Sequence, residues 1–414
     1  QHNYNRAANE LTEVMATRLE MNALAEGLVQ KLALFLQLKR LGILIFKEER
    51  ECCGHAGVGF GDLDWDAFCR RTGPQLVAEM QRSRSETRFG TDVLPDRLKR
   101  RLDEVGIRQI IPIRFKNKLV GSFVIGEKRS ESPLDLEDLT FMSSVSRQVA
   151  IALENAFLYE GLAEQERLKH ELEIARRIQM ASLPQNTPEV PGLDIAGVSI
   201  PAREVGGDYF DYLDGGSPGL TVIVGDVSGK GTSAALYMSK IQGILRSLYQ
   251  FDLSPRELFI RANQLLLRDL EKKAFITAIG ASFKTGQNRV VLARAGHLPL
   301  FCYRVESGKV ELITPRGMGL GLDNDPVFAD ELEEKTVTYR PDDVFLFVTD
   351  GVTEAQTKVG GLFGEDKLAR VLAEVAPLCA DAIRDRIVSE VKQFVSDALP
   401  YDDQTVVVVK ARAL

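Results

Sequence analysis

Four acidic sites in the C-terminal half share one context, the edge of an apolar segment. They are Asp208 in VGGDYFD, Asp226 in TVIVGDVSGKG, Asp350 in VFLFVTDGVTEA, and the pair Asp402 and Asp403 in PYDDQTVVVV. A carboxylate at the end of a buried strand is costly to desolvate unless an opposite charge compensates it. Carboxylate oxygens suit a hard divalent cation such as Mg²⁺ or Mn²⁺, so these positions predict a metal cluster.

Each of these carboxylates also has a simpler interpretation, as a helix cap or a turn residue. For any single Asp this simpler role is the more common one. For all of them together it would require a coincidence at the end of every apolar strand. The sequence therefore favours the metal cluster.

Five segments, in chain order, resemble the motifs of the PPM phosphatases, the protein phosphatase 2C-like superfamily. They span residues 190–412 and read PAREVGGDYFD, GDVSGKGTSAAL, ARAGHLPL, TDGVTEA with GGLFGEDKL, and DDQTVVVV. The similarity is greatest to the bacterial branch that includes SpoIIE and RsbU. This resemblance implies a regulated metal-dependent phosphoserine/phosphothreonine protein phosphatase that acts on an anti-anti-sigma-factor-like phosphoprotein in bacterial signalling.

The resemblance also implies a role for each acidic residue around two Mn²⁺ or Mg²⁺ ions. Asp226 matches the bridging ligand, and the backbone carbonyl of Val227 matches the ligand beside it. Asp208 resembles a ligand of the second metal, and Asp350 a ligand of the first. Asp226 and Asp350 would thus hold a metal-activated water that attacks phosphorus directly, with no phosphoenzyme.

Three further residues are candidates with open alternatives. Asp402 matches a ligand of the first metal and Asp403 its neighbour, but the motif offers two adjacent carboxylates, and the choice between them stays open. Arg203 is similar to the phosphate-binding Arg of other PPM enzymes, although an exposed Arg is the default interpretation. His297 in AGHLPL is either an acid for the leaving serine oxygen or part of a structural turn.

Two other functions compete with the phosphatase. GDVSGKGTS suggests a nucleotide-binding P-loop, but only three residues separate Gly225 from Gly229, and Gly231 instead of Ser or Thr follows Lys230. A catalytically silent PPM-fold module that binds a partner protein is the second alternative. It is disfavoured because every assigned ligand position is still an Asp.

The elements expected to position these residues form an α+β fold rather than a doubly wound parallel sheet. We predict strands at LDIAGVS, LTVIVGD, FITAIGASF, RVVLARA, KVELIT, VFLFVTD and TVVVVK, with helices at 233–249, 255–270 and 380–398. Pro184, Pro188 and Pro191 mark the start of this domain. We therefore expect a phosphatase domain at 190–414, built as two packed, mainly antiparallel sheets flanked by helices, as in the PPM fold.

The first 155 residues resemble a GAF domain, a small sensory fold with a sheet between helices. The resemblance rests on the apolar helical spacing from Glu10 to Gln37, the strands GILIFKEE, IRQIIPIRF and LVGSFVIGE, and the exit helix that begins near Asp135. Residues 62–101 are expected to cover a pocket. The signal that this domain would bind, a small molecule, a protein or a redox state, is left open.

The exit helix is predicted to continue through a linker at residues 156–189. Leu158, Leu162, Leu168, Leu172, Ala175 and Ile178 form an interrupted apolar seam along it. A short parallel coiled coil in a homodimer explains this seam, while a single helix packed on its own domain is the alternative.

Composition disfavours several classes of function. A formal net charge of −7 gives no basic surface for nucleic acid. No segment approaches the roughly 20 apolar residues of a membrane span, and the start QHNYNRAANE lacks an apolar signal core, so we expect a cytoplasmic protein. Cys52, Cys53 and Cys69 lack the paired spacing of a zinc site and are expected to be reduced thiols, with a sensor cysteine among them as the alternative.

Overall fold

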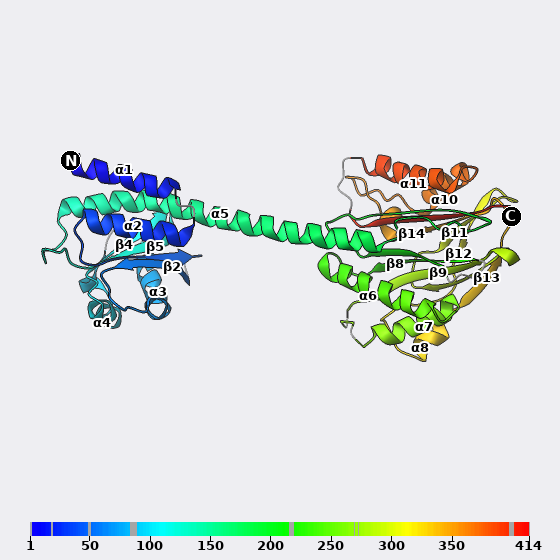
Figure 1. Cartoon of the computed structure of the whole chain (residues 1–414), viewed down its shortest axis with the longest axis horizontal. Helices are drawn as coiled ribbons and strands as arrows, with labels where there is room; N and C mark the ends of the chain where they lie inside the picture. Colours follow the sequence, from blue (N-terminus) through cyan, green and yellow to red (C-terminus); the bar gives the residue numbers. More distant parts are fainter. Residues whose placement is uncertain are drawn as a thin grey trace. The chain divides into compact units, whose positions relative to one another are not determined.

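The computed structural model describes residues 2–17, 20–48, 51–82, 89–214, 219–268, 270–271, 273–396 and 401–413. The chain divides into two compact units, Gln1–Leu168 and Lys169–Leu414 (Figure 1). The boundary falls inside helix α5 (Leu136–Ser182) and inside the predicted linker. Within the described residues, no helix combines the length and apolarity needed to cross a membrane.

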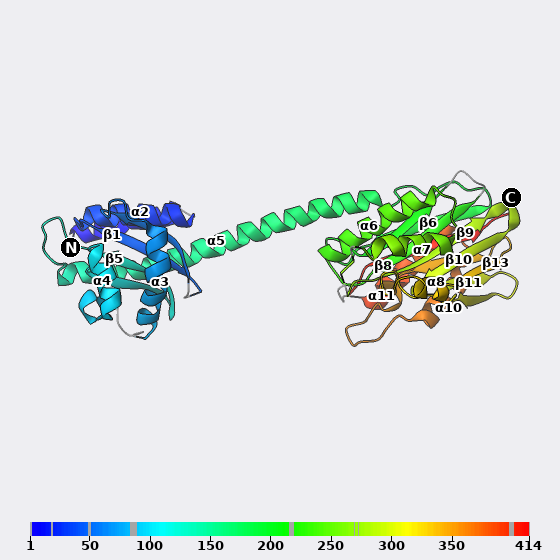
Figure 2. The same cartoon turned by 90° about the horizontal axis from the view of Figure 1, so that it is seen from below.

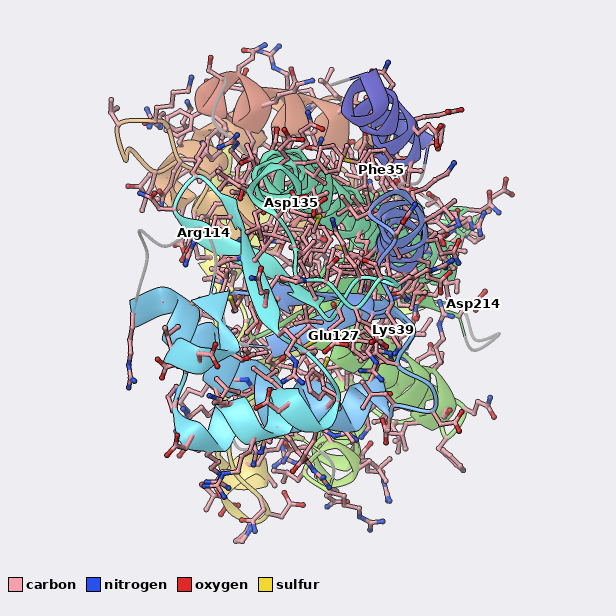
Figure 3. The ribbon with its side chains drawn as sticks, turned by 90° about the vertical axis from the view of Figure 1, so that its left-hand side faces the viewer. Phe35, Lys39, Arg114, Glu127, Asp135 and Asp214 are labelled. Atoms are coloured by element: carbon pink, nitrogen blue, oxygen red, sulfur yellow. The ribbon has the colours of Figure 1, made fainter. Side chains whose placement is uncertain are left out.

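The N-terminal unit is built on one antiparallel five-stranded sheet with the order β2-β1-β5-β4-β3. Its strands are β1 (Leu41–Lys47), β2 (Glu51–Val58), β3 (Phe89–Gly90), β4 (Gln109–Phe115) and β5 (Lys118–Ile125). The β4–β5 hairpin turns at Lys116, whose φ is 54°. At the other end of the sheet, the backbone N–H of Lys39 donates to Glu127 at 2.8 Å, and both residues are labelled in Figure 3.

Helices cover both faces of this sheet (Figures 1 and 2). One face carries α1 (His2–Thr17), α2 (Met21–Phe35) and the first part of α5, and their apolar side chains share one core with β1 and β5. The other face carries α3 (Trp65–Arg82) and α4 (Asp96–Glu104), which follows the short 3-10 helix η1 (Thr91–Val93). The sheet between helices is the arrangement that the GAF resemblance implied.

Two elements of this unit differ from the sequence expectation. Residues 10–37 form two helices instead of one, with residues 18 and 19 outside the described part of the chain. Residues 62–101, expected only as a polar region over a pocket, contain α3 and α4. Both helices bury apolar side chains, such as Leu76 and Leu102, against the sheet.

The C-terminal unit packs two antiparallel five-stranded sheets against each other. Their orders are β13-β10-β9-β8-β7 and β12-β11-β14-β15-β6. The strands of the first are β7 (Asp208–Leu213), β8 (Leu220–Val227), β9 (Ile276–Lys284), β10 (Arg289–Ala295) and β13 (Glu334–Thr338). Those of the second are β6 (Leu193–Ile200), β11 (Leu300–Arg304), β12 (Lys309–Ile313), β14 (Val344–Val348) and β15 (Gln404–Ala411).

Helices flank the two sheets on their outer faces (Figure 1). Helices α6 (Thr232–Tyr249) and α7 (Pro255–Leu266) cover the first sheet, and α10 (Glu365–Val375) and α11 (Ala380–Val395) cover the second. Short helices complete the unit: η2 (Thr285–Gln287), α8 (Val327–Glu331) and α9 (Asp350–Thr353). The layered α+β architecture predicted from the sequence is confirmed.

The end of α5 belongs to the C-terminal unit. Met180 and Leu183 pack into its core, and the side chain of Gln179 is buried there. Between the two cores, the helix exposes apolar side chains of the predicted seam: Leu158 is 59% exposed, Leu162 56% and Leu168 48%.

Candidate active site

The acidic residues lie where strands of both sheets begin or end. In the first sheet, Asp208 opens β7 and pairs directly across from Asp226, near the end of β8. In the second sheet, Asp350 follows β14 as the first residue of α9, and Asp402 and Asp403 precede β15. The packing of the two sheets therefore gathers positions that are far apart in sequence.

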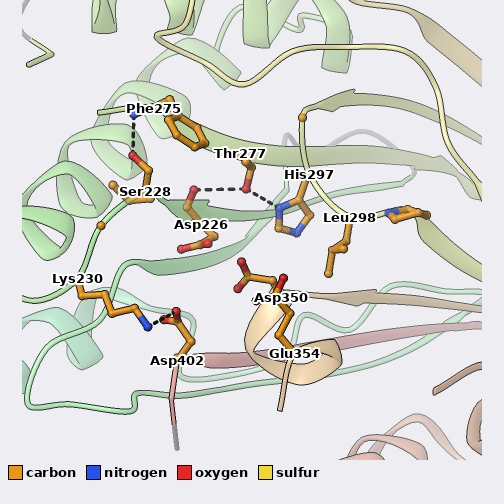
Figure 4. Close-up of a pocket in the computed structure, with 14 residues that line it drawn as sticks. Asp226, Ser228, Lys230, Phe275, Thr277, His297, Leu298, Asp350, Glu354 and Asp402 are labelled. Carbon is orange, nitrogen blue, oxygen red and sulfur yellow. Dashed lines mark hydrogen bonds and ion pairs between the residues drawn. The ribbon is translucent and has the colours of Figure 1, made fainter. Parts of the chain in front are cut away.

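Three of these carboxylates line one open cavity of about 450 Å³. They are Asp226, Asp350 and Asp402, and Val227, Lys230 and His297 also line it. Figure 4 shows the carboxylates of Asp226 and Asp350 turned towards each other across the cavity, with Lys230 beside Asp402.

Asp226 has the most strained electrostatic environment of the three. Burial raises its pKa to about 8, and the nearby charges of Asp350 and Asp402 add to the shift. Burial and the charge of Asp402 also raise the pKa of Asp350. Burial first, and mutual repulsion second, therefore disfavour the charged forms of these carboxylates, and a bound cation would offset both effects.

Asp208 is buried, with 4% of its surface exposed, and it joins the two sheets. Its Oδ2 accepts hydrogen bonds from the hydroxyls of Thr349 and Thr405, both at 2.7 Å. Burial, followed by the charge of Asp226, holds the pKa of Asp208 well above its usual range. Asp208 does not line the cavity itself but lies directly behind Asp226.

Asp402 and Asp403 have different surroundings. The carboxylate of Asp403 is buried and accepts the backbone N–H groups of Ala202 at 2.8 Å and Gly207 at 2.7 Å. A Cβ at Gly206 would lie 2.4 Å from its Oδ2, so only glycine allows this approach. Asp402 instead lines the cavity, and its Oδ2 lies 2.7 Å from Nζ of Lys230.

Lys230 is the functional candidate that sequence reasoning missed, because it was weighed only as part of a P-loop. Its Nζ bonds Asp402 and the carbonyl of Tyr401 at 2.8 Å, and lies 3.5 Å from the centre of the Tyr401 ring. Gly229 and Gly231, with φ of 96° and 81°, form the turn that carries it. The signal available in the sequence was one cation placed four residues after the central Asp226.

His297 is held as a structural group. Its Nε2 lies 3.1 Å from the carbonyl of Val348, and its Nδ1 lies 2.9 Å from the hydroxyl of Thr277 (Figure 4). Burial lowers the pKa of His297 to about 4, so the ring is neutral near pH 7. A neutral imidazole that donates to a carbonyl through Nε2 is a poor proton donor to a leaving group, which favours the structural alternative.

Arg203 and Gln179 both lie outside the cavity lining, but only Gln179 is connected to the site. Arg203 is exposed and is not among the residues that line the cavity. Gln179, which sequence reasoning missed, bonds both polar groups of the Gly206 backbone, donating to its carbonyl at 2.7 Å and accepting its N–H at 3.0 Å. The end of α5 thus holds the same segment that Asp403 holds.

The residues of the cavity fit a divalent cation in chemistry, although their side chains are not yet closed around one. Among the described residues, no three acidic, histidine or cysteine side chains are already grouped as a metal site. The donors are carboxylate and carbonyl oxygens, which Mg²⁺ and Mn²⁺ prefer. Burial, with the repulsion between neighbouring carboxylates, raises the pKa of Asp226 and of Asp350, and a divalent cation would stabilise their charged forms.

The fold and the acidic cavity define a protein phosphatase 2C-like enzyme behind a sensory domain. Residues 216–412 match the family model of stage II sporulation protein E (SpoIIE), and residues 20–153 match the GAF domain model. The C-terminal unit thus contains a SpoIIE domain and the N-terminal unit a GAF domain, and the chain is a protein serine/threonine phosphatase of signal transduction.

Known proteins are similar to this chain in sequence or in fold. The chain is 26% identical to the phosphoserine phosphatase RsbU of Bacillus subtilis over 293 residues. This alignment covers 70% of this chain and 84% of RsbU. It is 26% identical over 267 residues to protein IcfG of Synechocystis, covering 58% of this chain and 41% of IcfG. The SiaA-PP2C domain of Pseudomonas aeruginosa superposes with a TM-score of 0.54 at 19% identity, over 60% of this chain and 98% of that domain.

Proposed function

We propose that this chain is a metal-dependent phosphoserine/phosphothreonine phosphatase whose GAF unit regulates it. The observation that supports the proposal is the convergence of Asp226, Asp350 and Asp402 on one open cavity. Asp226 comes from β8 of one sheet, whereas Asp350 and Asp402 flank the paired strands β14 and β15 of the other sheet. A purely structural role for all three would leave their mutual repulsion unexplained. The cavity is also open enough to admit a phosphorylated side chain.

In this proposal the acidic residues hold two Mn²⁺ or Mg²⁺ ions. Asp226, the backbone carbonyl of Val227, Asp350 and Asp402 would hold them. Asp208 contributes to the second ion, and because both of its threonine bonds engage Oδ2, Oδ1 is the oxygen left for that role. Asp403 supports the site indirectly by fixing Ala202 and Gly207.

The cations, when bound, supply a nucleophile from water at neutral pH and neutralise the phosphoryl oxygens. The side chains of this protein do the positioning. Asp226 and Asp350 face each other across the cavity and define where the phosphorus must sit (Figure 4). Lys230 places a positive charge at the cavity wall beside Asp402, where it would attract the phosphate group of a substrate.

The substrate class follows from similarity and is part of the proposal. RsbU is a phosphoserine phosphatase, and the alignment with it extends beyond the catalytic unit, over 70% of this chain. We infer that this chain removes phosphate from serine or threonine of an anti-anti-sigma-factor-like protein. We also infer a homodimer, because the seam on α5 exposes apolar side chains in a single chain.

The first experiment measures hydrolysis of para-nitrophenyl phosphate by the full chain across a Mn²⁺ titration. The second compares phosphate release from a serine-phosphorylated anti-anti-sigma-factor-like protein with release from a phosphotyrosine peptide. We expect Mn²⁺-dependent turnover, preference for the phosphoserine protein, and loss of both activities in Asp226→Asn. Asp366→Asn, an exposed carboxylate outside the cavity, is the matched control and should behave as wild type. Absence of turnover at saturating Mn²⁺ or Mg²⁺ would favour the silent binding module.

A further inference from the structure

Two thiols meet in the N-terminal unit, at the contact between β2 and α3. The Sγ atoms of Cys52 and Cys69 lie 2.7 Å apart. Cys52 is half-buried on β2, and Cys69 is 5% exposed on α3. All of the protein's cysteines are free thiols in this structure.

Glycines and an aromatic side chain fix the distance between strand and helix. A Cβ at Gly73, one turn after Cys69, would lie 3.6 Å from Cβ of Cys52, so the helix approaches β2 closely on this face. One turn before Cys69, the ring of Trp65 lies so close to Gly57 that a Cβ there would be 2.0 Å from it. The Cys52–Cys69 contact is therefore enclosed by packing on both sides along the helix.

The two sulfurs have different chemical properties. The hydrogen bond with Cys69 lowers the pKa of Cys52, against the opposing effect of burial. The same hydrogen bond, together with burial, raises the pKa of Cys69. In the neutral pair the Cys52 thiol donates to the sulfur of Cys69. Cys52 is the more easily formed thiolate and, being less buried, the more accessible nucleophile, and once it is ionised Cys69 keeps its proton and becomes the donor.

We propose that Cys52 and Cys69 form a redox-sensitive pair that a peroxide converts into an intramolecular disulfide. The sulfurs need to move together by less than about 1 Å to reach a bond length near 2.05 Å. The site lies in the sensory unit, and its chemistry does not depend on the phosphatase proposal.

The reaction balances with hydrogen peroxide as the oxidant. The Cys52 thiolate attacks one peroxide oxygen, the O–O bond breaks, and the released hydroxide takes a proton to become water, which leaves Cys52 as a sulfenic acid. The sulfur of Cys69 then attacks the sulfur of Cys52, the S–O bond breaks, and the second water leaves with the Cys69 proton. The sum is two thiols and one peroxide giving one disulfide and two waters, and a dithiol reductant reverses it.

The bond would tie the strand to the helix that covers it. Residues 52–69 would become a closed loop containing the β2 end and the start of α3. In this loop His55 and Asp66 already form a second link between the same two elements, with Nε2 and Oδ1 3.0 Å apart. Oxidation would therefore hold this contact closed covalently until a reductant breaks the bond.

Cys53 provides an internal control beside the pair. It is exposed, and it is the extra residue of a β-bulge, because Phe46 pairs with Cys52 and Ile45 with Gly54. Its Sγ lies 3.6 Å from the carbonyl of Ile45, and burial raises its pKa to about 11. Exposure alone would favour Cys53 over Cys69 as the partner in oxidation, whereas the geometry favours Cys69.

The test is to treat the full chain with hydrogen peroxide, block remaining thiols with a maleimide, and map the products by mass spectrometry with and without reduction. We expect two thiols to disappear together, one peptide pair linking Cys52 to Cys69, a monomeric disulfide on non-reducing gels, and full recovery with a dithiol reductant. Cys53→Ser should oxidise as wild type. Cys69→Ala should stop at a Cys52 sulfenic acid that a 1,3-dione reagent labels, and Cys52→Ser should keep the Cys69 thiol.

Mapping of the wild-type protein decides the question even if the Cys69→Ala variant does not fold. A Cys52–Cys53 linkage, a disulfide between chains, or retention of both thiols under peroxide that oxidises Cys379 would each overturn the proposal. Phosphatase activity is recorded in parallel but is not the criterion.

Discussion

Asp208 and Asp226 face each other across two paired strands, so their negative charges work against folding until a cation arrives. We predict that Asp226→Asn abolishes metal-dependent turnover, to less than a tenth of wild type, and leaves the fold intact. Without metal, the variant should melt at the same temperature as wild type or higher. Both measurements use the same preparation, with circular dichroism melting in a chelator and initial rates at saturating Mn²⁺.

The sign of the pH dependence follows from the raised pKa of Asp226. A carboxyl whose pKa rises from 3.8 to about 8 on folding binds more protons in the folded state, so its contribution to stability is complete below pH 3.8 and is lost as pH rises towards 8. The metal-free wild-type protein should therefore lose up to about 4 kcal/mol of stability between pH 5 and 8 from this residue. Asp226→Asn should lose less over the same range, and an equal loss in both proteins would contradict the assignment.

Substitution of Asp402 and of Asp403 should have different effects, because Asp402 lines the cavity and Asp403 accepts hydrogen bonds from backbone N–H groups. Asp402→Ala is expected to raise the Mn²⁺ concentration for half-maximal rate about tenfold or more, as does Asp350→Ala, with little loss of stability. Asp403→Ala removes two charge-assisted bonds to backbone N–H groups and should cost about 2–3 kcal/mol of unfolding free energy, with a smaller direct effect on metal affinity. Urea unfolding and Mn²⁺ titration together distinguish them, and the reverse pattern would exchange their roles.

Lys230 competes with a cation for Asp402, so its removal should favour metal binding. We predict that Lys230→Met increases the Mn²⁺ affinity several-fold in calorimetry, because the ion no longer displaces or faces an ammonium group. At the same time the Michaelis constant for a phosphorylated substrate should rise. Lys335→Met, an exposed lysine of β13, is the control. Unchanged Mn²⁺ affinity would mean that the 2.7 Å ion pair does not oppose metal binding.

For individual residues, the sequence indicated the positions of the acidic side chains but not their hydrogen-bond partners. An Asp at the end of an apolar run is visible in the sequence, and Asp226, Asp350 and Asp402 were all identified in this way. Thr349 and Thr405 were not, because their role depends on a contact with Asp208 that spans 141 and 197 positions. No local pattern marks such a contact.

Among the elements, the strands with uniform apolar runs were predicted well, whereas β7 and β2 were not predicted. Strands β8, β14 and β15 are buried on both faces and read as continuous apolar segments. Strand β7 contains two Asp residues among aromatics, and β2 contains glycine and polar residues, so neither shows a clear period. Their structure comes from pairing with β8 and β1.

The end of α5 does not line the acidic cavity, but changes in it should affect the cavity indirectly, through the backbone of Gly206. Gln179→Ala removes both bonds to Gly206, next to the backbone that Asp403 binds. We predict a loss of about 1–3 kcal/mol in unfolding free energy of the C-terminal unit and a higher Mn²⁺ requirement for activity. Glu173→Ala, an exposed change on the same helix, is the control, and an equal effect in both variants would remove Gln179 from this role.

For the molecule as a whole, α5 is the element shared by both units. Its last residues also contact α6, since the side chains of Gln242 and Arg246 donate to the carbonyl of Ser182 at 2.8 and 3.0 Å. Helix α6 begins shortly after Asp226, so α5 contacts two segments that adjoin the acidic cavity. We therefore hypothesise that the sensor changes metal occupancy through this helix, within the few kcal/mol typical of allosteric coupling.

A flexible Gly-Ser insertion after Gln165 tests this hypothesis. We predict a shift in the Mn²⁺ concentration for half-maximal rate and a weaker dimer, measured by sedimentation across protein concentration, because the apolar seam from Leu158 to Ile178 loses its register. An insertion of the same length after Gly308, in the β11–β12 turn, is the control. If the linker insertion changes neither property, the helix is a passive spacer, while the phosphatase assignment stands.

The strand β15 lies between β14 and β6 in its sheet and is preceded by Asp402 and Asp403. The carboxylate of Asp403 reaches Ala202, 201 positions earlier. During synthesis, β6 through β14 therefore leave the ribosome without the strand that completes their sheet and without one wall of the cavity. The acidic cavity therefore cannot be completed until Asp402 and β15 have been synthesised, by which time the whole N-terminal unit has already left the ribosome.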